Sequence, residues 1–293
     1  MNEYLTITPG ELKTRDLHRY MLGAISPRPI AFASTISGDG TPNLAPFSFF
    51  NVFSSNPPTV IFSPARRVRN NTTKDTLSNV YEVPEVVVNV VSHRIVQQMN
   101  LASSDYPYNV SEFEKAGFTP LPSELVRPPR VAESPVQFEC KIVEIKPLGE
   151  HGGAGQLIFG RVLRLHINQA VLTKERFIDP HKIDLVGRMG DAYYSRASGR
   201  AVFEVEKPLA QPGIGIDALP EHIRNSKQLT GNDLGRLGNM PALPDAAQIQ
   251  AWWKTHGAQY HNQNPFRAAR ALLAANQKMD ALLLLLNPTL TGK

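Results

Sequence analysis

The chain has 293 residues, of which 42% are apolar and 19% charged, so most of it should fold around one large core or one core with an appendage. A net charge of +5 is spread along the sequence rather than gathered in a run, which argues against a nucleic-acid-binding protein. With a single cysteine, Cys140, and no Cys/His spacing typical of zinc sites, we expect neither a disulfide nor a metal site.

Short apolar and β-branched runs separated by Gly, Pro and Asn extend from Pro27 to about Pro208, which is typical of an all-β barrel or sandwich. The predicted strands are Pro29–Ser37, Pro42–Asn51, Thr59–Ser63, Glu85–Val91, Val136–Pro147, Gln156–Asn168 and Ala201–Glu206. Gly38-Asp39-Gly40 should form a tight turn between the first two strands, because Gly and Asp tolerate positive φ.

Two helices are predicted inside this β-rich region. The first covers Thr73–Glu82, with Thr72 or Thr73 as its N-cap and Asp75 in its first turn. The second covers His93–Asn100. Helices therefore form a minor part of this region.

The glycine-rich segment Gly149–Gly155 has two interpretations, a hairpin turn or a phosphate-binding loop. A phosphate loop would be followed by Gly-Lys-Ser/Thr and a helix, and neither is present. We therefore expect a long β-hairpin between Val136–Pro147 and Gln156–Asn168.

The pattern changes near residue 210, where strand signals end and helical periodicity begins over Ala246–His256 and Phe266–Leu286. Residues 1–210 are predicted to form the β-barrel domain. Residues 211–293 should form a helical extension that packs on the barrel or on a dimer partner.

No targeting or membrane segment is expected. The first 25 residues lack a basic start followed by an apolar stretch, so they do not resemble a secretory signal. Arg267, Arg270, Lys278 and Asp280 interrupt the apolar segment Phe266–Leu286, which is predicted to be a packed amphipathic helix. We expect a cytoplasmic protein that does not contact a membrane.

Ser26–Ala31 and Asn43–Asn51 carry the residues that most suggest chemistry. Together they place a guanidinium, amides, hydroxyls and aromatic side chains on two adjacent predicted strands. A flat ring with polar edges needs apolar faces and hydrogen-bonding groups along one edge, and these segments offer both. By pattern alone, however, a barrel core with polar edge residues explains them better.

The order and spacing of several segments resemble the flavin reductase-like family, whose members share an FMN-binding split barrel. The resemblance runs from about Ser26 to Lys207. Its carriers are Ser26–Ala33, Gly38–Gly40, Asn43–Asn51, Lys74–Thr76, Asn100–Ser103, Glu133–Pro135 and Arg188–Tyr194. It implies a mainly β fold, an FMN-binding split barrel of Greek-key type, followed by the helical C-terminal extension.

Carried over residue by residue, the resemblance assigns a wall for the flavin ring. Its members are Arg28, Pro29, Asn43, Leu44, Ala45, Pro46, Ser48, Phe49 and Asn51. Leu101, Ala102 and Ser103 resemble a segment that closes over the flavin. Tyr194 would stack near the ring or fill the core.

Ser63, Lys74, Asp75 and Thr76 resemble the phosphate site of the family. The residues themselves also favour a phosphate site, because a helix that starts near Thr73 exposes free N–H groups at its positive end, and Lys74 adds a positive charge. An ordinary capped helix start is the alternative interpretation. Of the basic loop residues Arg66, Arg67 and Arg69, we favour Arg69 as a further phosphate ligand, although such a cluster is more often a solvated loop.

The resemblance implies an FMN-dependent oxidoreductase that takes electrons from NADH or NADPH, forms a homodimer and delivers reduced flavin to a partner monooxygenase. None of the eight histidines lies in a triad, and no catalytic residue is assigned, because hydride transfer to flavin depends on alignment. Two alternatives stay open. One is an FMN enzyme for a specific organic substrate, or an electron carrier; the other is a non-enzymatic barrel protein that binds flavin or haem.

Overall fold

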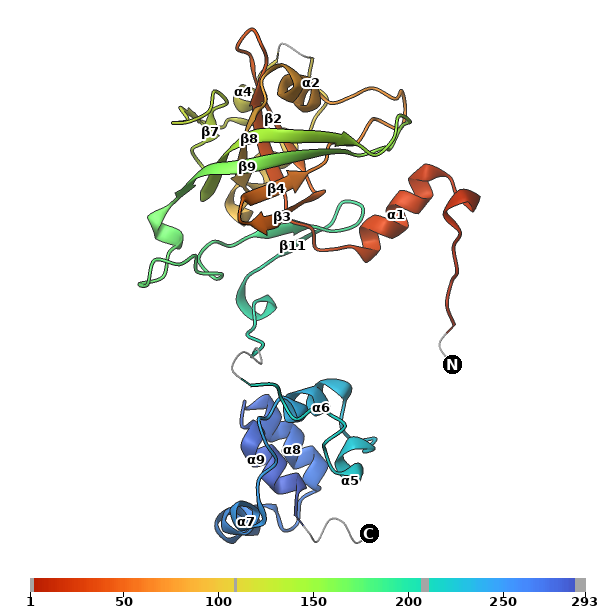
Figure 1. The fold of residues 1–293 in the computed structure, drawn as a ribbon, viewed down its shortest axis with the longest axis vertical. Helices are drawn as coiled ribbons and strands as arrows, with labels where there is room; N and C mark the ends of the chain where they lie inside the picture. Colours follow the sequence, from red (N-terminus) through yellow and green to blue (C-terminus); the bar gives the residue numbers. More distant parts are fainter. Residues whose placement is uncertain (1–2, 108–109, 207–210, 288–293) are drawn as a thin grey trace. The chain divides into compact units, whose positions relative to one another are not determined.

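The computed structural model describes residues 3–107, 110–206 and 211–287. The chain divides into two compact units, Met1–Phe203 and Glu204–Lys293. The first unit is mainly antiparallel β-sheet with short helices, and the second is helical (Figure 1). The boundary predicted near residue 210 lies outside the described residues.

The first unit contains a seven-stranded antiparallel sheet, counted over the residues that the structure describes. Its strand order is β2 (Pro42–Phe47), β1 (Ala31–Ile36), β5 (Glu85–Val90), β8 (Val136–Pro147), β9 (Gln156–Ile167), β4 (Pro58–Phe62) and β3 (Phe50–Ser55). Five of the seven predicted strands are confirmed in these elements, with small shifts at their ends, and the predicted strand Pro42–Asn51 covers β2 and the start of β3.

The two edge strands of this sheet, β2 and β3, are separated in the chain only by Ser48 and Phe49. The three Cα–Cα steps from Phe47 to Phe50 span at most about 11 Å, so the sheet must curl until its edges approach each other. No ladder joins β2 to β3 among the described strands. The barrel is therefore open along one seam, and the predicted strand Pro42–Asn51 is in fact two strands.

Both faces of β1 and β5 are covered, which explains their continuous apolar and small residues. One face packs inside the barrel, where Phe62 and Ile158 meet side chains of α2 (Asp75–Glu82). The other face of β1 packs on α3 (Val96–Leu101) and α4 (Glu112–Ala116). The other face of β5 lies against β7 (Arg130–Val131), where Oδ1 of Asn89 accepts the backbone N–H of Val131 at 2.9 Å.

The predicted hairpin is confirmed by β8 and β9, which pair over their whole length and form the longest strands in Figure 1. Its loop packs closely on the segment that follows β4. At Gly152 a Cβ atom would lie 2.9 Å from the Cα of Val68, so only glycine allows this approach. The loop therefore supports the basic segment rather than forming a phosphate loop.

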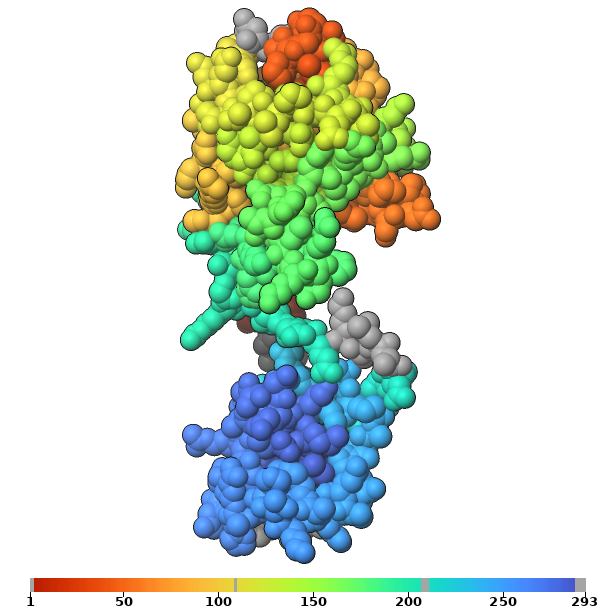
Figure 2. Space-filling model, turned by 90° about the vertical axis from the view of Figure 1, so that its left-hand side faces the viewer, coloured from red at the N-terminus to blue at the C-terminus, as the bar shows by residue number. Residues whose placement is uncertain are grey.

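The segment between α4 and β8 is fastened to the same hairpin. The backbone amides of Glu124 and Leu125 donate to the buried carboxylate of Glu139, at 2.9 and 2.6 Å. Glu124 also forms an ion pair with Arg164 of β9. Figure 2 shows this face of the unit, with the yellow-green segment beside the green strand.

Helix α2 begins at Asp75, later than predicted, and neither Thr72 nor Thr73 is its N-cap. Lys74 holds that position without a side-chain cap. The threonines are used elsewhere, because the Arg67 guanidinium donates to the Thr72 hydroxyl at 3.1 Å and to the Thr73 carbonyl. The predicted helix at His93–Asn100 is confirmed as η2 (His93–Ile95) followed by α3.

The predicted strand Ala201–Glu206 is wrong. The structure has η4 (Gly199–Ala201) followed by chain without regular structure, in which Phe203 and Val205 are exposed. The alternating apolar residues resemble a strand, but no described strand pairs with them. Local pattern alone could not show that a partner was missing.

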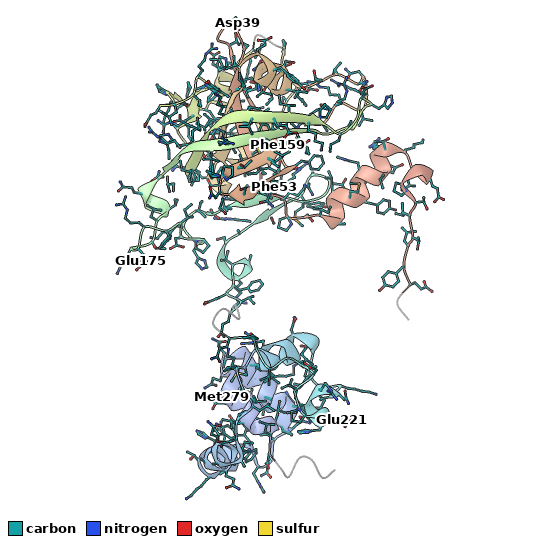
Figure 3. The ribbon with its side chains drawn as sticks, in the orientation of Figure 1. Asp39, Phe53, Phe159, Glu175, Glu221 and Met279 are labelled. Atoms are coloured by element: carbon teal, nitrogen blue, oxygen red, sulfur yellow. The ribbon has the colours of Figure 1, made fainter. Side chains whose placement is uncertain are left out.

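The first unit also contains short elements that the sequence did not predict. Besides α4 and η4, they are η1 (Pro9–Glu11), α1 (Thr14–Ala24), β6 (Pro120–Leu121), β7 (Arg130–Val131), η3 (Gln169–Val171), β10 (Val186–Arg188) and β11 (Tyr194–Arg196). The predicted turn at Gly38–Gly40 is present, and Figure 3 shows Asp39 at its tip. Gly40 has a φ of 93°, as the turn prediction requires.

The second unit consists of short helices around its own core. They are α5 (Glu221–Arg224), α6 (Gly231–Gly238), α7 (Ala246–Tyr260), α8 (Pro265–Ala274) and α9 (Lys278–Leu285). The single helix predicted over Phe266–Leu286 is two helices, because Asn276 adopts a φ of 62° and ends α8. This break lets the run Leu282–Leu285 bury every side chain.

A buried carboxylate covers part of the outer edge of β2. Oε2 of Glu112, in the first turn of α4, accepts the backbone N–H of Leu44 at 3.0 Å. Burial raises the pKa of the Glu112 carboxyl. The protonated form is therefore favoured in the folded state, and this contribution to stability is lost as the pH rises through the raised pKa.

Replacing Glu112 tests this edge contact. Glu112→Ala leaves the Leu44 N–H buried without an acceptor, and we expect it to lower the free energy of unfolding by about 1–3 kcal/mol. Glu112→Gln keeps an acceptor and carries no charge, so its stability relative to wild type should be greatest at pH 8 and decline at pH 5. Denaturant unfolding at both pH values measures this, and a Gln–Glu difference independent of pH would contradict it.

Candidate functional site

Three cations meet at one carboxylate beside the start of α2. Nη2 of Arg67 and Nζ of Lys74 lie 3.1 and 3.0 Å from Oδ1 of Asp105, and Nη2 of Arg69 lies 3.0 Å from Oδ2. We call Arg67, Arg69 and Lys74 the cation cluster. Hydrogen bonds from Lys74 and Arg67 lower the pKa of Asp105. Three positive charges and one negative charge leave the group at +2.

Arg67 is the most constrained member of the cation cluster. Only 20% of its side chain is exposed, against 71% for Arg69. Its Nε is buried and has no hydrogen-bond partner within the described part of the chain. The sequence favoured Arg69, and the structure brings both arginines to the same point.

The predicted hydroxyl ligands lie deeper than the cations. Thr76 is only 1% exposed, and its Oγ1 accepts a hydrogen bond from Nδ2 of Asn43 at 2.9 Å. The Ser63 hydroxyl accepts the N–H of Gln156 at 2.9 Å. Both hydroxyls are thus engaged inside the protein, while Asp75 is half-buried at the start of α2.

The Arg28 guanidinium fastens several segments together. It donates to the carbonyls of Leu22 and Ile25, each at 2.6 Å, and to that of Met189 at 2.9 Å. Its Nε lies 3.4 Å from the Ser48 hydroxyl. The side chain is therefore used to position α1, the β10–β11 turn and the β2–β3 junction. Burial, and then the nearby Arg188, lower its pKa.

The residues predicted to line the ring do not share one face. Asn43 and Ala45 share the face of β2 that turns to α2 and the barrel interior, whereas Leu44 is fully buried on the outer face against the helices. The remaining predicted wall residues, Pro29, Pro46, Ser48, Phe49 and Asn51, range from half-buried to exposed.

The end of α3 connects the cation cluster to a pocket. Ala102 is buried in the core, Leu101 is exposed, and the Ser103 hydroxyl donates to the Asn100 carbonyl. Asn100 lines a pocket of about 430 Å³ between α3 and the β10–β11 hairpin. The other lining residues are His93, Val96, Gln97, Val186, Arg188, Ala192, Tyr194, Ser195 and Arg196.

Sequence reasoning missed Asp105 and the polar pocket residues of α3. Arg188 and Tyr194 lay in a segment that carried the resemblance, but only Tyr194 received a role. No local pattern distinguishes Asp105 from other loop acids, because its function depends on cations 31 to 38 residues earlier. Within the described ranges there is no cluster of His, Cys, Asp and Glu suited to a metal, and no helix long and apolar enough to cross a membrane.

Residues 22–180 match the model of the flavin reductase like domain, which is more than half of the chain. The protein belongs to the flavin reductase-like family.

Solved structures of similar proteins agree with this assignment. Component B of nitrilotriacetate monooxygenase from Bacillus cereus is 33% identical, with a TM-score of 0.65 over 70% of this chain and 100% of that one. A 2-nitrobenzoate 2-nitroreductase from Pseudomonas fluorescens is 28% identical, with a TM-score of 0.62 over 71% and 100%.

A flavin reductase with a split barrel domain from Shewanella frigidimarina is 24% identical and has a TM-score of 0.57 over 68% of this chain and 95% of that one. At this identity the similarity shows the fold alone, and it confirms the predicted split barrel.

Arg28→Lys tests the positioning role of the guanidinium. An ammonium cannot hold three carbonyls in the same fork, and bonds from a charged donor are worth about 1.5–3 kcal/mol each, so we expect a loss of about 2 kcal/mol or more in unfolding free energy. Limited proteolysis should cut near α1 faster than in wild type. Arg19→Lys is the control, since its partner Asp191 is exposed and little should change.

Proposed function

We propose that the protein is an FMN-dependent NAD(P)H:flavin oxidoreductase. The observation that carries this proposal is the cation cluster at the start of α2, in a chain of the flavin reductase-like family. A phosphate monoester has a charge of about −1.5 to −2 at neutral pH, which matches the +2 that the cluster and Asp105 leave. The first-turn amides of α2 add donors at the positive end of the helix.

The path from the cation cluster to the pocket beside α3 supports a ligand with one anionic end and one flat end. The segment from Asn100 to Asp105 leads from the pocket to the cation cluster, so a phosphate at Lys74 can accompany a ring near Tyr194. In this proposal Ser48, Phe49 and Pro29 contribute to the ring wall, and Arg28 acts by holding that wall in place. The bound flavin would supply the electron-transfer chemistry itself.

Partners and location are proposals as well. A monooxygenase that receives reduced flavin fits the similarity to a monooxygenase component B. Exposed apolar side chains on α1 and β3, among them Met21, Val52 and Phe53, suit a homodimer interface. Figure 3 labels Phe53 on this strand. A cytoplasmic location remains an expectation.

The similarity to a 2-nitrobenzoate 2-nitroreductase favours one alternative, an FMN enzyme with its own organic substrate. The reductase and the substrate-specific enzyme can be distinguished by the oxidation of NADH and NADPH, measured with and without added FMN and with and without 2-nitrobenzoate. Turnover that requires free FMN supports the reductase, and turnover that requires 2-nitrobenzoate supports the alternative. A preparation that binds no flavin would contradict both.

Lys74→Ala tests the phosphate contact. Because one charge-assisted contact is lost, we expect FMN to bind about 10- to 100-fold more weakly, while riboflavin binding stays unchanged. Fluorescence titration with both flavins measures this, with Lys141→Ala on β8 as a control of equal charge change. Equal losses for FMN and riboflavin would show that the phosphate does not bind at Lys74.

The role of residues 211–293 stays a prediction, namely that they pack on the barrel or on a dimer partner. A chain that ends after Glu206 keeps every residue assigned to the site. We expect the truncated chain to retain flavin binding, but to differ from the full chain in the number of subunits per oligomer or in FMN affinity. Light scattering and titration measure both properties, and an unchanged dimer with unchanged affinity would refute the predicted packing.

A further inference from the structure

Arg188 differs from Arg28, Arg67, Arg69 and Arg196 because its guanidinium is not paired with a hydrogen-bond acceptor in the part of the chain that the structure describes. Its guanidinium lies over the Tyr194 ring, with Cζ 4.6 Å from the ring centroid. Over residues 3–107, 110–206 and 211–287, its side chain has no hydrogen-bond acceptor and no ion pair. Arg196, in the same pocket, is neutralised by Asp184 through bonds of 2.7 and 2.8 Å.

The backbone around Arg188 is held by several contacts. Arg188 and Arg28 exchange backbone hydrogen bonds of 2.8 and 2.9 Å. Tyr194, paired with Arg188 across the β10–β11 hairpin, has its hydroxyl 3.4 Å from Oδ1 of Asn100 on α3. Beside it, a Cβ on Gly187 would lie 2.7 Å from Pro27, so the backbone is tightly packed. The backbone that carries Arg188 is therefore ordered without a ligand, and the contact with the Tyr194 ring positions the guanidinium.

The surrounding pocket suits a small anionic molecule. Its volume of about 430 Å³ lies in the range of small-molecule sites. Gln97, Asn100 and His93 supply hydrogen-bonding groups, and Val96 and Val186 supply apolar surface. A forked guanidinium binds a carboxylate or phosphate through two parallel bonds.

FMN does not need this charge. It carries one phosphate, and the cation cluster already matches that charge. The unit therefore has two separate places for anions, one of them around Asp105 and the other at Arg188. Since FMN has one phosphate, we assign the place at Arg188 to a second molecule, which would lie against the edge of the flavin ring near Tyr194.

We propose that the pocket between α3 and the β10–β11 hairpin binds the oxyanion of the second substrate, and that Arg188 is the residue that recognises it. This inference rests on the proposed function, in which the second substrate exchanges electrons with the flavin. Two sources share this chemistry, the pyrophosphate of a nicotinamide dinucleotide and the carboxylate of an aromatic acid.

Titration of two simple probes, ADP and benzoate, tests the proposal and distinguishes the two sources. We expect wild-type protein to bind at least one probe, Arg188→Gln to bind it about tenfold or more weakly, and Arg188→Lys to lie between them, because a point charge lacks the fork. Weakening for ADP indicates a dinucleotide, and weakening for benzoate indicates an aromatic acid.

Arg161→Gln is the matched control, since it removes one exposed arginine from β9 of the same unit. Each titration is made with and without FMN, and FMN affinity is measured separately. Failure of FMN to bind contradicts the proposed function but leaves the probe test of the pocket intact. The inference is overturned if Arg188→Gln binds both probes like wild type, if neither probe binds wild type, or if the variant weakens FMN and not the probes.

Discussion

The Arg28 guanidinium is the contact on which the site region depends. Three backbone carbonyls from α1, its following turn and the β10–β11 turn converge on it, and the Ser48 hydroxyl lies at its edge. None of these segments has a long ladder or a large core of its own. A buried, multiply bonded cation can order them because each lost bond would leave a charge without compensation. The open seam of the barrel and the pocket wall are thereby fixed to one side chain.

Most cations of the site region are likewise paired with acceptors of the protein itself. Asp105 gathers Arg67, Arg69 and Lys74, Asp184 neutralises Arg196, and backbone carbonyls take up Arg28. Arg188 alone in this region is balanced by an aromatic ring rather than by an acceptor in the described residues. The arrangement separates cations that hold the fold from cations that are available to ligands.

Much of the fold could be predicted from the sequence, because period-two patterns and turn residues are local. The β8–β9 hairpin was predicted with almost its observed ends, since alternation and a glycine-rich loop coincide there. Ala201–Glu206 was wrong because pairing is not local. Helix α1 was missed although Leu17, Tyr20 and Met21 recur at helical spacing, because the segment is short and its N-cap, Lys13, gives no capping signal. For the site, the resemblance indicated the segments. It could not show that Arg28 turns to carbonyls or that Asp105 joins the cluster.

The two cores have a thermodynamic consequence. The helical unit buries Leu282–Leu285 and Trp252 among its own helices, and the barrel unit buries Phe62 and Ile158 inside its sheet. A chain with two such cores does not behave as a single two-state system. Heat denaturation then need not have one midpoint: each unit has its own core and its own stability curve, and a ligand bound to the barrel acts directly on the transition of that unit.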